Sequence, residues 1–398
     1  MSKLYPCRRN LFIKRRMKNR LFFSISVLYA SILASGCSKP NATPEALIVP
    51  QVIDQVLVSQ LFDEIKYLGL WSENEAMPSR VDQLEFHNDE TFILDKQQSK
   101  IFRFSKEGKM IAFLDRKGEG PGEYIYLHRF LIDSDAQTIE LYDKGKQEIL
   151  VFDLNFNFLE SFKINLFFEN FVKLSNRKYL CYLAQENLFM DKSVLNNLVV
   201  WDKGKLTFSD IPQLGTDSRF QFKGLAKDPS DGMVHITQSF NDTIYKYSPK
   251  SNSIVGKQKV VFPDPIEGIY SSIDEVNQAY MDIPYSSNID YLHVSPDLVS
   301  FNYYHRDKGR LKLHSFYHFT KTNTIINSKK LINDNDNFNL FEHMGFENGY
   351  LVNVILPDYL AVIDINNTSK DFQNTVNGKS LEDQIIILFL KPKKSPVF

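Results

Sequence analysis

The residue types that most often carry catalysis form no recognisable catalytic pattern in this chain. Its histidines are His87, His128, His235, His293, His305, His314, His318 and His343. They form no H-E-x-x-H motif, and no paired cysteines accompany them at the spacing of a zinc site. No G-x-S-x-G elbow is present, and no serine can be tied to a histidine and an acid. The sequence therefore predicts no catalytic residue, no metal and no cofactor.

Cys37 is the residue whose surroundings best indicate a chemical role. Basic residues between positions 8 and 20 precede an apolar run at 21–33, which ends in Ala34-Ser35-Gly36-Cys37. The run is shorter than the ~20 residues needed to span a bilayer, and its small-residue ending is typical of a signal peptide. This ending resembles a lipobox, which implies cleavage before Cys37 and attachment of diacylglycerol to its thiol. The alternative is an uncleaved anchor, or a secretory signal with a chance cysteine.

The chain that follows the signal peptide is acidic. Removal of residues 1–36 takes away eight Lys and Arg residues and no acids, which changes the formal charge from −1 to −9. Because nucleic-acid affinity depends on neutralising phosphates, we expect no nucleic-acid partner. No later apolar stretch can cross a bilayer, so we expect membrane attachment through the lipid alone. We expect an outer-membrane lipoprotein of the cell envelope, on the periplasmic face because no acids directly follow Cys37.

An internal repeat organises the rest of the sequence. The segment Phe92-Ile93-Leu94-Asp95-Lys96 has a counterpart in Glu140-Leu141-Tyr142-Asp143-Lys144, and Ile101 and Phe104 have counterparts in Ile149 and Phe152. Each offset is 48 residues. Looser copies follow at residues 198–201, 244–247 and 316–319. Short β-branched and aromatic runs separated by turn residues at such a period are typical of propeller blades.

We therefore predict an all-β fold, a six-bladed β-propeller closed by its N- and C-terminal strands. A single blade is apolar on both faces and stays unstable until its neighbours cover it. Residues 64–70 and 385–390 are expected to pair and close the ring. The predicted organisation is a signal peptide at 1–36, the lipidated Cys37 and a flexible tether at 37–52, and the propeller at 53–393.

Residues 116–124 carry a family resemblance. They read Arg-Lys-Gly-Glu-Gly-Pro-Gly-Glu-Tyr, which resembles the G-x-G-P-G-E-Y signature of six-bladed β-propeller lipoproteins of Bacteroidetes. The strand pattern is similar over most of residues 60–391. The resemblance implies architecture and export, and it implies no common activity.

Two segments are candidates for ligand contact. The glycine-rich segment is predicted to form a tight connection between blades, with Arg116 and Glu123 at the rim of the channel. Residues 263–288 interrupt the repeat and carry Tyr270, Tyr280 and Tyr285, whose rings suit sugar or peptide stacking. The alternative is that the glycine-rich segment is a purely structural connection and that residues 263–288 form a lid that only stabilises the fold. The run Asn333-Asp334-Asn335-Asp336-Asn337 lacks the glycine and glutamate of an EF-hand and is expected to be a solvated turn.

Two functions from different classes remain compatible with the sequence. The first is a monomeric recognition module that binds a glycan, a peptide or a partner protein at the propeller funnel. The second is a hydrolase or lyase acting on polysaccharide, which needs converging titratable groups with shifted pKa values at the same place. The absence of catalytic motifs favours the first.

The role of Cys37 can be tested directly. A Cys37→Ala variant should incorporate no radiolabelled palmitate and should leave the membrane fraction of detergent-free lysates, because no other thiol follows the apolar run closely. A Cys181→Ala variant should retain the label, since Cys181 is expected to be a buried, unpaired side chain. Normal labelling of the Cys37→Ala variant would refute the lipoprotein hypothesis.

Overall fold

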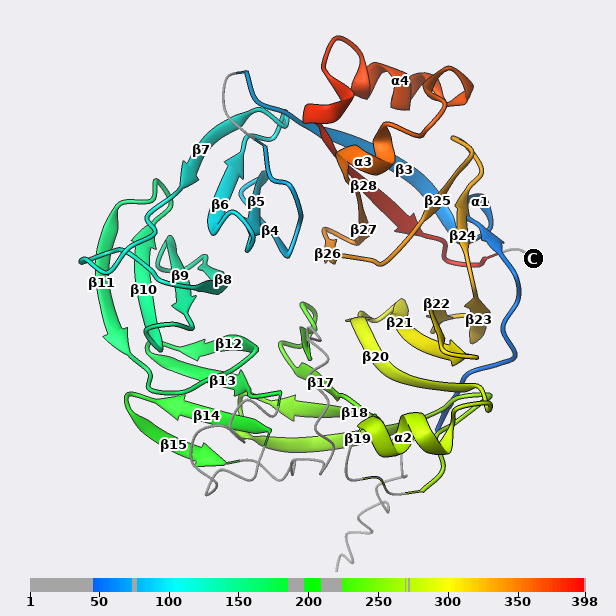
Figure 1. Cartoon of the computed structure of the whole chain (residues 1–398), viewed down its shortest axis with the longest axis horizontal. Helices are drawn as coiled ribbons and strands as arrows, with labels where there is room; N and C mark the ends of the chain where they lie inside the picture. Colours follow the sequence, from blue (N-terminus) through cyan, green and yellow to red (C-terminus); the bar gives the residue numbers. More distant parts are fainter. Residues whose placement is uncertain are drawn as a thin grey trace, which may run out of the picture. The chain divides into compact units, whose positions relative to one another are not determined.

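A computed structural model describes residues 46–396, with gaps at 74–76, 185–196, 209–223, 269 and 271–272. The described strands form seven sheets arranged in a ring (Figure 1). The predicted all-β propeller is therefore present, but the prediction of six blades is wrong, because the strands form seven. The predicted signal peptide and Cys37 lie outside the described residues.

Four of the sheets each consist of four strands that are consecutive in the sequence. They contain β4 (Gln83–His87), β5 (Glu90–Asp95), β6 (Lys100–Phe104) and β7 (Met110–Leu114); β8 (Leu127–Asp133), β9 (Thr138–Asp143), β10 (Glu148–Asp153) and β11 (Phe158–Lys163); β12 (Asn170–Ser175), β13 (Lys178–Tyr182), β14 (Leu198–Asp202) and β15 (Lys205–Phe208); and β20 (Tyr285–Val294), β21 (Leu298–Asp307), β22 (Arg310–Phe319) and β23 (Thr324–Ser328). Within each sheet, consecutive strands are antiparallel.

The other three sheets include a strand from the beginning of the described chain. One joins β1 (Leu47–Ile48) to β19 (Ser253–Val261), β18 (Asn241–Ser248), β17 (Val234–Gln238) and β16 (Leu225–Lys227). The second is β2 (Val56–Leu57), β24 (Leu331–Asn333) and β25 (Phe338–Leu340), and the third is β26 (Gly345–Glu347), β27 (Tyr350–Ile355), β28 (Ile385–Pro392) and β3 (Phe62–Leu70). Because β1 pairs with β19, the fold begins before Ile53, where the propeller was predicted to start.

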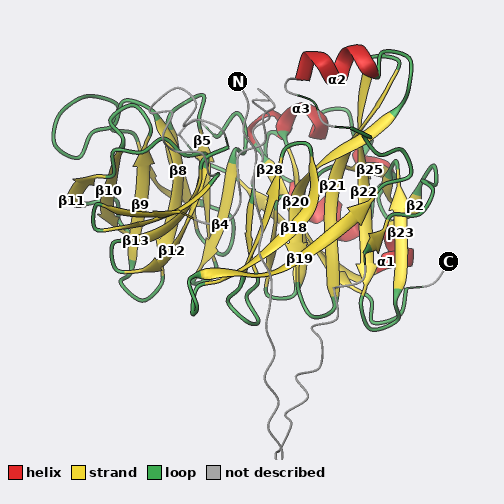
Figure 2. Cartoon of the chain, turned by 90° about the horizontal axis from the view of Figure 1, so that it is seen from below, coloured by secondary structure: helices red, strands yellow, loops and turns green. Residues whose placement is uncertain are grey.

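Short helices lie outside the sheets. They are α1 (Val58–Leu61), α2 (Ile273–Ala279), α3 (Pro357–Leu360) and α4 (Lys370–Val376), with 3-10 turns at Ile365–Asn367 and Leu381–Asp383. Leu360 in α3, with Phe372 and Val376 in α4, packs into the apolar cluster around β28. Figure 2 shows α2 beyond one end of the strands.

The alternation of side chains within a strand explains why the sequence forms stacked blades. In β5, Phe92, Ile93 and Leu94 are all fully buried. Phe92 and Leu94 pack against the β8–β11 sheet, whereas Ile93 packs toward the sheet that contains β28. Successive residues of a strand point to opposite faces, so this apolar run requires a neighbouring sheet on each side.

The aspartate of the repeat has the same structural role in two blades. Asp95 and Asp143 are fully buried at the ends of β5 and β9. Asp95 accepts hydrogen bonds from the backbone N–H groups of Ser79 and Gln98, at 2.8 and 2.9 Å. Asp143 accepts them from Ile125, Tyr126 and Gly145, each at 2.9 Å. Each carboxylate thus joins the connection that enters a blade to a turn within that blade.

Ring closure follows the predicted pairing. Strand β28 pairs antiparallel with β3, with Ile385 opposite Leu70 and Leu390 opposite Ile65, and its other edge pairs with β27 (Figure 1). Residues 385–388 and Leu390 are fully buried. The C-terminal strand therefore occupies the interior of a sheet whose outer strand comes from the beginning of the described chain.

The three-stranded sheet was not predicted. Its Val56, Leu331, Phe338 and Leu340 share an apolar cluster with Leu388 and other residues of the closing sheet. In the turn between β24 and β25, Asn335 and Asn337 are exposed, as expected for a solvated turn, but Asn333 and Asp336 are buried, which corrects the expectation for these two residues. Asp336 contacts the hydroxyl of Tyr67 in β3 and accepts a 2.8 Å hydrogen bond from the backbone N–H of Ser369. This turn therefore anchors the small sheet.

The closing strand can be tested by a single substitution. Leu388→Ala should lower the free energy of unfolding by about 2–5 kcal/mol, because it leaves a cavity in a fully buried cluster. In denaturant, all the sheets should unfold together in a single transition. Val362→Ala is the control, since Val362 is 74% exposed and should change stability by about 0.5 kcal/mol or less. A separate early transition confined to one sheet would contradict closure by β28.

Candidate functional site

A cavity of about 290 Å³ occupies the channel at the centre of the ring. Strands β4, β8, β12, β16, β17, β20 and β26 line it, so six of the seven sheets contribute and the β2-β24-β25 sheet does not. Its charged and imidazole-bearing lining residues are Glu85, Arg129, Lys227, His235, His293, His343 and Glu347. Several blades therefore present polar side chains to one point, which is the geometry of a ligand site.

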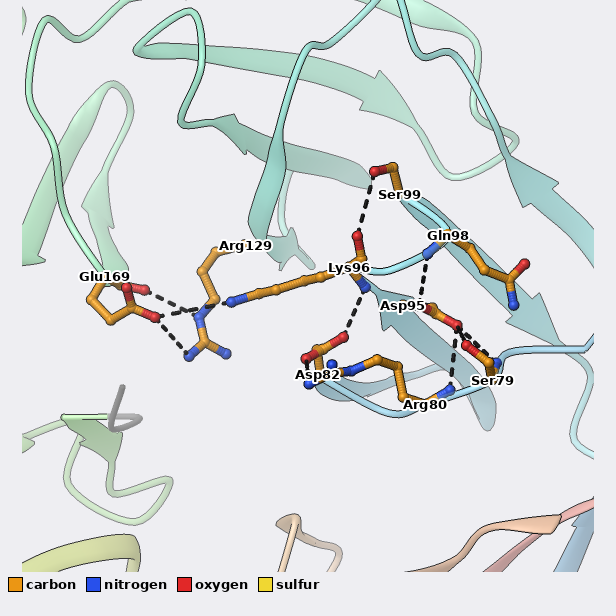
Figure 3. Close-up of polar contacts among 9 residues, drawn as sticks. All are labelled: Ser79, Arg80, Asp82, Asp95, Lys96, Gln98, Ser99, Arg129 and Glu169. Atoms are coloured by element: carbon orange, nitrogen blue, oxygen red, sulfur yellow. Dashed lines mark hydrogen bonds and ion pairs between the residues drawn. The ribbon is translucent and has the colours of Figure 1, made fainter. Parts of the chain in front are cut away.

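A group of cations surrounds Glu169 where the innermost strands begin. The Glu169 carboxylate lies 3.8 Å from the Arg129 guanidinium, 3.9 Å from the Lys96 amine and 3.8 Å from the Lys144 amine. His128 Nε2 lies 3.0 Å away. We call these five residues the Glu169 cluster. Figure 3 shows Lys96 and Arg129 converging on Glu169 from two different blades.

The repeat and the ring connections together build the Glu169 cluster. Lys96 and Lys144 each follow the buried repeat aspartate, so the turn that holds Asp95 or Asp143 also positions the lysine. Glu169 directly precedes β12, and its backbone carbonyl accepts a 3.1 Å hydrogen bond from Arg129 Nε. The cluster thus combines residues from three consecutive blades.

Burial shapes the ionisation of the cluster. The pKa of Lys96 is lowered to about 8, first by burial and then by the charge of Arg129. Burial likewise lowers the pKa of His128 to about 4, so its imidazole is neutral at pH 7. Burial alone would raise the pKa of Glu169, but His128, Arg129 and Lys96 outweigh it and lower that pKa. One carboxylate therefore faces three cations, and the cluster carries net positive charge.

Arg129 is the member of the Glu169 cluster that lines the cavity. Its side chain is only 7% exposed. Apart from the Nε bond to Glu169, its guanidinium makes no hydrogen bond to any described residue, and the nearest carboxylate oxygen lies 3.8 Å from Nη2. A guanidinium offers five donors that match a planar anion. Arg129 therefore presents unused donors at the cavity wall.

Two histidines line the cavity toward the end where the innermost strands finish. His235 and His293 are buried, and within the described part of the chain neither Nε2 atom has a hydrogen-bond partner. Burial lowers the pKa of His235, and it lowers the pKa of His293 to about 3. The His293 ring stacks on Phe346 with centroids 3.7 Å apart. Both imidazoles are therefore neutral, and their unpartnered nitrogens are unusual because buried polar groups are normally bonded.

Acidic residues gather where the innermost strands end. Burial raises the pKa of Glu347, and the nearby charges of Glu85 and Asp89 raise it further. Glu85 and Glu347 line the cavity, and Asp89 lies in the turn that follows β4. We call these three residues the acidic end. Lys227, the last residue of β16, also lines the cavity, so both signs of charge occur where the innermost strands end.

An irregular segment of β20 lies between these ends. The pairing of β20 with β21 shifts between Asp290 and His293, which leaves Tyr291 and Leu292 outside the regular register. Tyr291 has φ of +49°, a left-handed conformation that a bulky residue rarely adopts. Both residues line the cavity. Bulges of this kind redirect side chains and are concentrated beside functional sites.

The glycine-rich segment forms the connection between blades that was predicted. Gly120 N donates 2.8 Å to the Glu123 carboxylate, and buried Tyr124 donates 2.7 Å to the Ser99 carbonyl. Only Gly122, of the three glycines, has positive φ, at +73°. A Cβ on Gly118 would lie 2.1 Å from Glu123 Oε2, so a larger residue there would displace the Glu123 carboxylate from its bond to Gly120 N.

The five residues predicted to contact ligand lie away from the cavity lining. Arg116 is exposed and lies over the Phe152 ring at 5.8 Å. Glu123 holds its own loop, and its carbonyl accepts a 2.8 Å bond from Lys146. Tyr270, Tyr280 and Tyr285 form a row with centroids 6.1 and 5.4 Å apart, and none of them is among the residues that line the cavity. Their part in binding stays a prediction, and the cavity is formed by other residues.

Sequence reasoning missed the residues that form the cavity and the Glu169 cluster. Lys96 and Lys144 belong to the 48-residue repeat, so the shared Asp-Lys pair was a usable signal. Glu169, Arg129 and the histidines carry no motif, because they meet only when the ring brings different blades together. Cys37, the predicted lipidation site, lies outside the described residues.

The fold and its axial cavity define the class of protein as a β-propeller. The chain belongs to the family described as Domain of unknown function (DUF4934), whose model matches residues 49–391. This membership agrees with the expectation of a Bacteroidetes propeller family that has no common activity. The glycine-rich signature stays a prediction. No curated protein matches the chain.

Solved structures share the fold. A crystallised Bacteroides fragilis protein described as exported has a TM-score of 0.69 and 18% identity, covering 88% of this chain and 99% of its own. A Bacteroides vulgatus member of the DUF4221 family has a TM-score of 0.50 and 10% identity, covering 84% of this chain and 98% of its own. At these identities the likeness concerns the fold alone. Among the described residues, no helix is long and apolar enough to cross a membrane.

The buried histidines predict acid sensitivity. Burial lowers the pKa values of His128, His314 and His343 to about 4 and that of His293 to about 3, whereas an unfolded histidine titrates near ~6.5. The unfolded chain therefore binds protons first, so stability is complete above pH ~6.5 and falls as the pH falls toward 4. Calorimetry across this range should show a falling melting temperature, with a smaller fall in a His293→Asn variant. Equal melting temperatures at pH 7 and pH 4 would contradict neutral burial.

Proposed function

We propose that this protein is an exported, lipid-anchored binding module that holds a small polar ligand in the channel of its propeller. The observation that carries the proposal is the placement of Arg129, whose guanidinium donors are largely unused at the wall of a cavity that six blades line. A buried charge without full pairing is costly. A ligand with a complementary group would offset that cost.

The export part of the proposal has two supports. The apolar run at 21–33 and the Ala34-Ser35-Gly36-Cys37 ending indicate a lipoprotein signal peptide. The similar Bacteroides fragilis protein is described as exported. The propeller fold suits a binding module, because propellers gather loops and inner strands from several blades around one axis.

The size of the cavity limits the ligand. At about 290 Å³, the cavity is near the lower end of the ~300–1,000 Å³ that small-molecule sites occupy. One sugar ring, a short peptide or the end residue of a longer chain fits this scale. A folded partner protein would have to insert such a group.

Fewer observations support catalysis than support binding. A general acid or base works best with a pKa near the operating pH, and the pKa of His293, at about 3, makes it a weak base. Lys96 has a pKa of about 8, but it lies in the Glu169 cluster and not among the residues that line the cavity. A polysaccharide hydrolase or lyase remains the alternative function, with Lys96 as the group to examine.

A ligand screen tests the proposal. The full-length chain, purified in detergent, should show saturable binding to a member of a library of acidic and neutral sugars and short peptides, without turnover. His235→Ala should weaken binding about fivefold or more, since a hydrogen bond contributes about 1 kcal/mol. His318→Ala is the control, because His318 bonds Asn323 and does not line the cavity. Turnover by wild type that Lys96→Gln abolishes would favour the enzymatic alternative.

A further inference from the structure

The unused donors of Arg129 favour an anionic group in the cavity. Among the described residues, the guanidinium makes only its Nε bond to the Glu169 backbone, and the side chain is 7% exposed. Lys96 and Lys144 lie 3.9 and 3.8 Å from the same Glu169 carboxylate, so positive charge is concentrated here. A carboxylate can accept two parallel N–H bonds from a guanidinium. This end of the cavity therefore suits a ligand with one carboxylate.

Glu85, which also lines the cavity, does not take the place of such a ligand group. Its carboxylate accepts a 2.9 Å hydrogen bond from the Gln83 amide, which also donates 2.6 Å to the Phe130 carbonyl. Within the described part of the chain, Arg129 forms an ion pair with Glu169 alone. The donors of Arg129 are therefore left for a ligand.

Both signs of charge occur at the end of the cavity where the innermost strands finish. Glu347 is the last residue of β26 and Lys227 is the last residue of β16, and both line the cavity. A second charge on the ligand would meet a like charge here. A hydroxyl group suits both residues, because it donates to a carboxylate and accepts from an ammonium. This end therefore favours hydroxyl groups over a second charge.

The middle of the cavity also suits hydroxyl groups. His235 and His293 are 8% and 9% exposed, and neither Nε2 atom has a hydrogen-bond partner among the described residues. A neutral imidazole nitrogen either donates to a hydroxyl or accepts from one. The C–H groups of a ring can pack on the apolar surface of Leu84, Phe86 and Phe346.

We propose that the ligand is a hexuronate sugar, with its carboxylate at Arg129 and its hydroxyl groups along the two histidines and toward Glu347 and Lys227. A single sugar ring matches the scale of a cavity of about 290 Å³. A peptide with free ends matches less well, because its ammonium would approach Lys227. This inference rests on the proposed function, because it names the ligand class of the same cavity.

The test compares sugars that differ only in the charge of one group. Calorimetric titration of the full-length chain in detergent uses glucuronate, galacturonate and their neutral amides, which have nearly the same shape. One uronate should bind, and its amide should bind about tenfold or more weakly, because the change removes a charged hydrogen bond. Equal binding of the uronate and its amide would overturn the proposal.

The hydroxyl groups are tested with cyclohexanecarboxylate, which keeps a six-membered ring and a carboxylate but has no hydroxyl. It should bind about tenfold or more weakly than the uronate, because it leaves the two imidazoles without partners. Binding as tight as that of the uronate would overturn the sugar assignment. Methyl glycosides of both uronates are included, since retained binding would identify the end residue of a glycan and lost binding the free sugar.

Variants assign the carboxylate to its partner. Arg129→Gln should bind the uronate and its amide equally, whereas Arg129→Lys should retain part of the preference, because it keeps a positive charge. Lys106→Gln should retain the full preference, since Lys106 is 70% exposed and does not line the cavity. An unchanged preference in Arg129→Gln would contradict the assignment. The comparison on the unsubstituted chain decides the question if Arg129→Gln fails to fold.

Other probes separate this inference from the proposed function. Trialanine, glucose and glucose 6-sulfate are titrated in parallel with the uronates. Binding of any of these three without binding of either uronate would overturn the uronate assignment and leave the binding module standing. No binding of any probe, with a negative library screen, would overturn both.

Discussion

Residues 62–70 and 385–392 lie at opposite ends of the described chain and form neighbouring strands of one sheet. The cavity depends on this pairing, because its lining comes from blades on both sides of the joint. The Glu169 cluster comes from the blades between β5 and β12, whereas Glu347 and His343 belong to the closing region. If the ring opened, these residues would no longer surround a common axis. Closure is thus a condition for the site.

The charge of the whole chain and the charge of the site differ in sign. After residue 36 the sequence carries a formal charge of −9, yet the Glu169 cluster places three cations around one carboxylate. Net charge governs solubility and long-range attraction, while recognition depends on groups within a few ångströms. Burial strengthens the local contribution, because charges in a low-dielectric environment interact more strongly than charges in water.

The sequence predicted the features that depend on local pattern. The 48-residue repeat located β5, β6, β9 and β10, and the apolar C-terminal run located β28 and its pairing with β3. The same repeat contained Asp95 and Asp143, whose hydrogen bonds explain why the position recurs. Such signals are visible because a strand covered on both faces carries a continuous apolar run.

The number of blades and the residues of the site could not be predicted from local sequence pattern. Strands β2, β24 and β25 have only two or three residues, which is too short for periodicity to appear, and the sheet is held by Asp336 and Tyr67 from distant segments. Arg129 and His293 are 164 positions apart in sequence and meet only through ring geometry. The aromatic insertion attracted the prediction of a site because it interrupts the repeat, although its tyrosines contact one another and are not among the residues that line the cavity.

The first strand of the fold has a mechanical consequence. β1 adds only Leu47 and Ile48, in parallel, to the outer edge of β19, and Leu47 and Val49 are the buried side chains that secure it. A force applied through the preceding segment reaches this short attachment before it reaches any complete blade. Few hydrogen bonds resist it, so β1 should peel away under a load that the closed ring withstands. The segment before the propeller then lengthens by several residues, so the complete sheets bear less of the force.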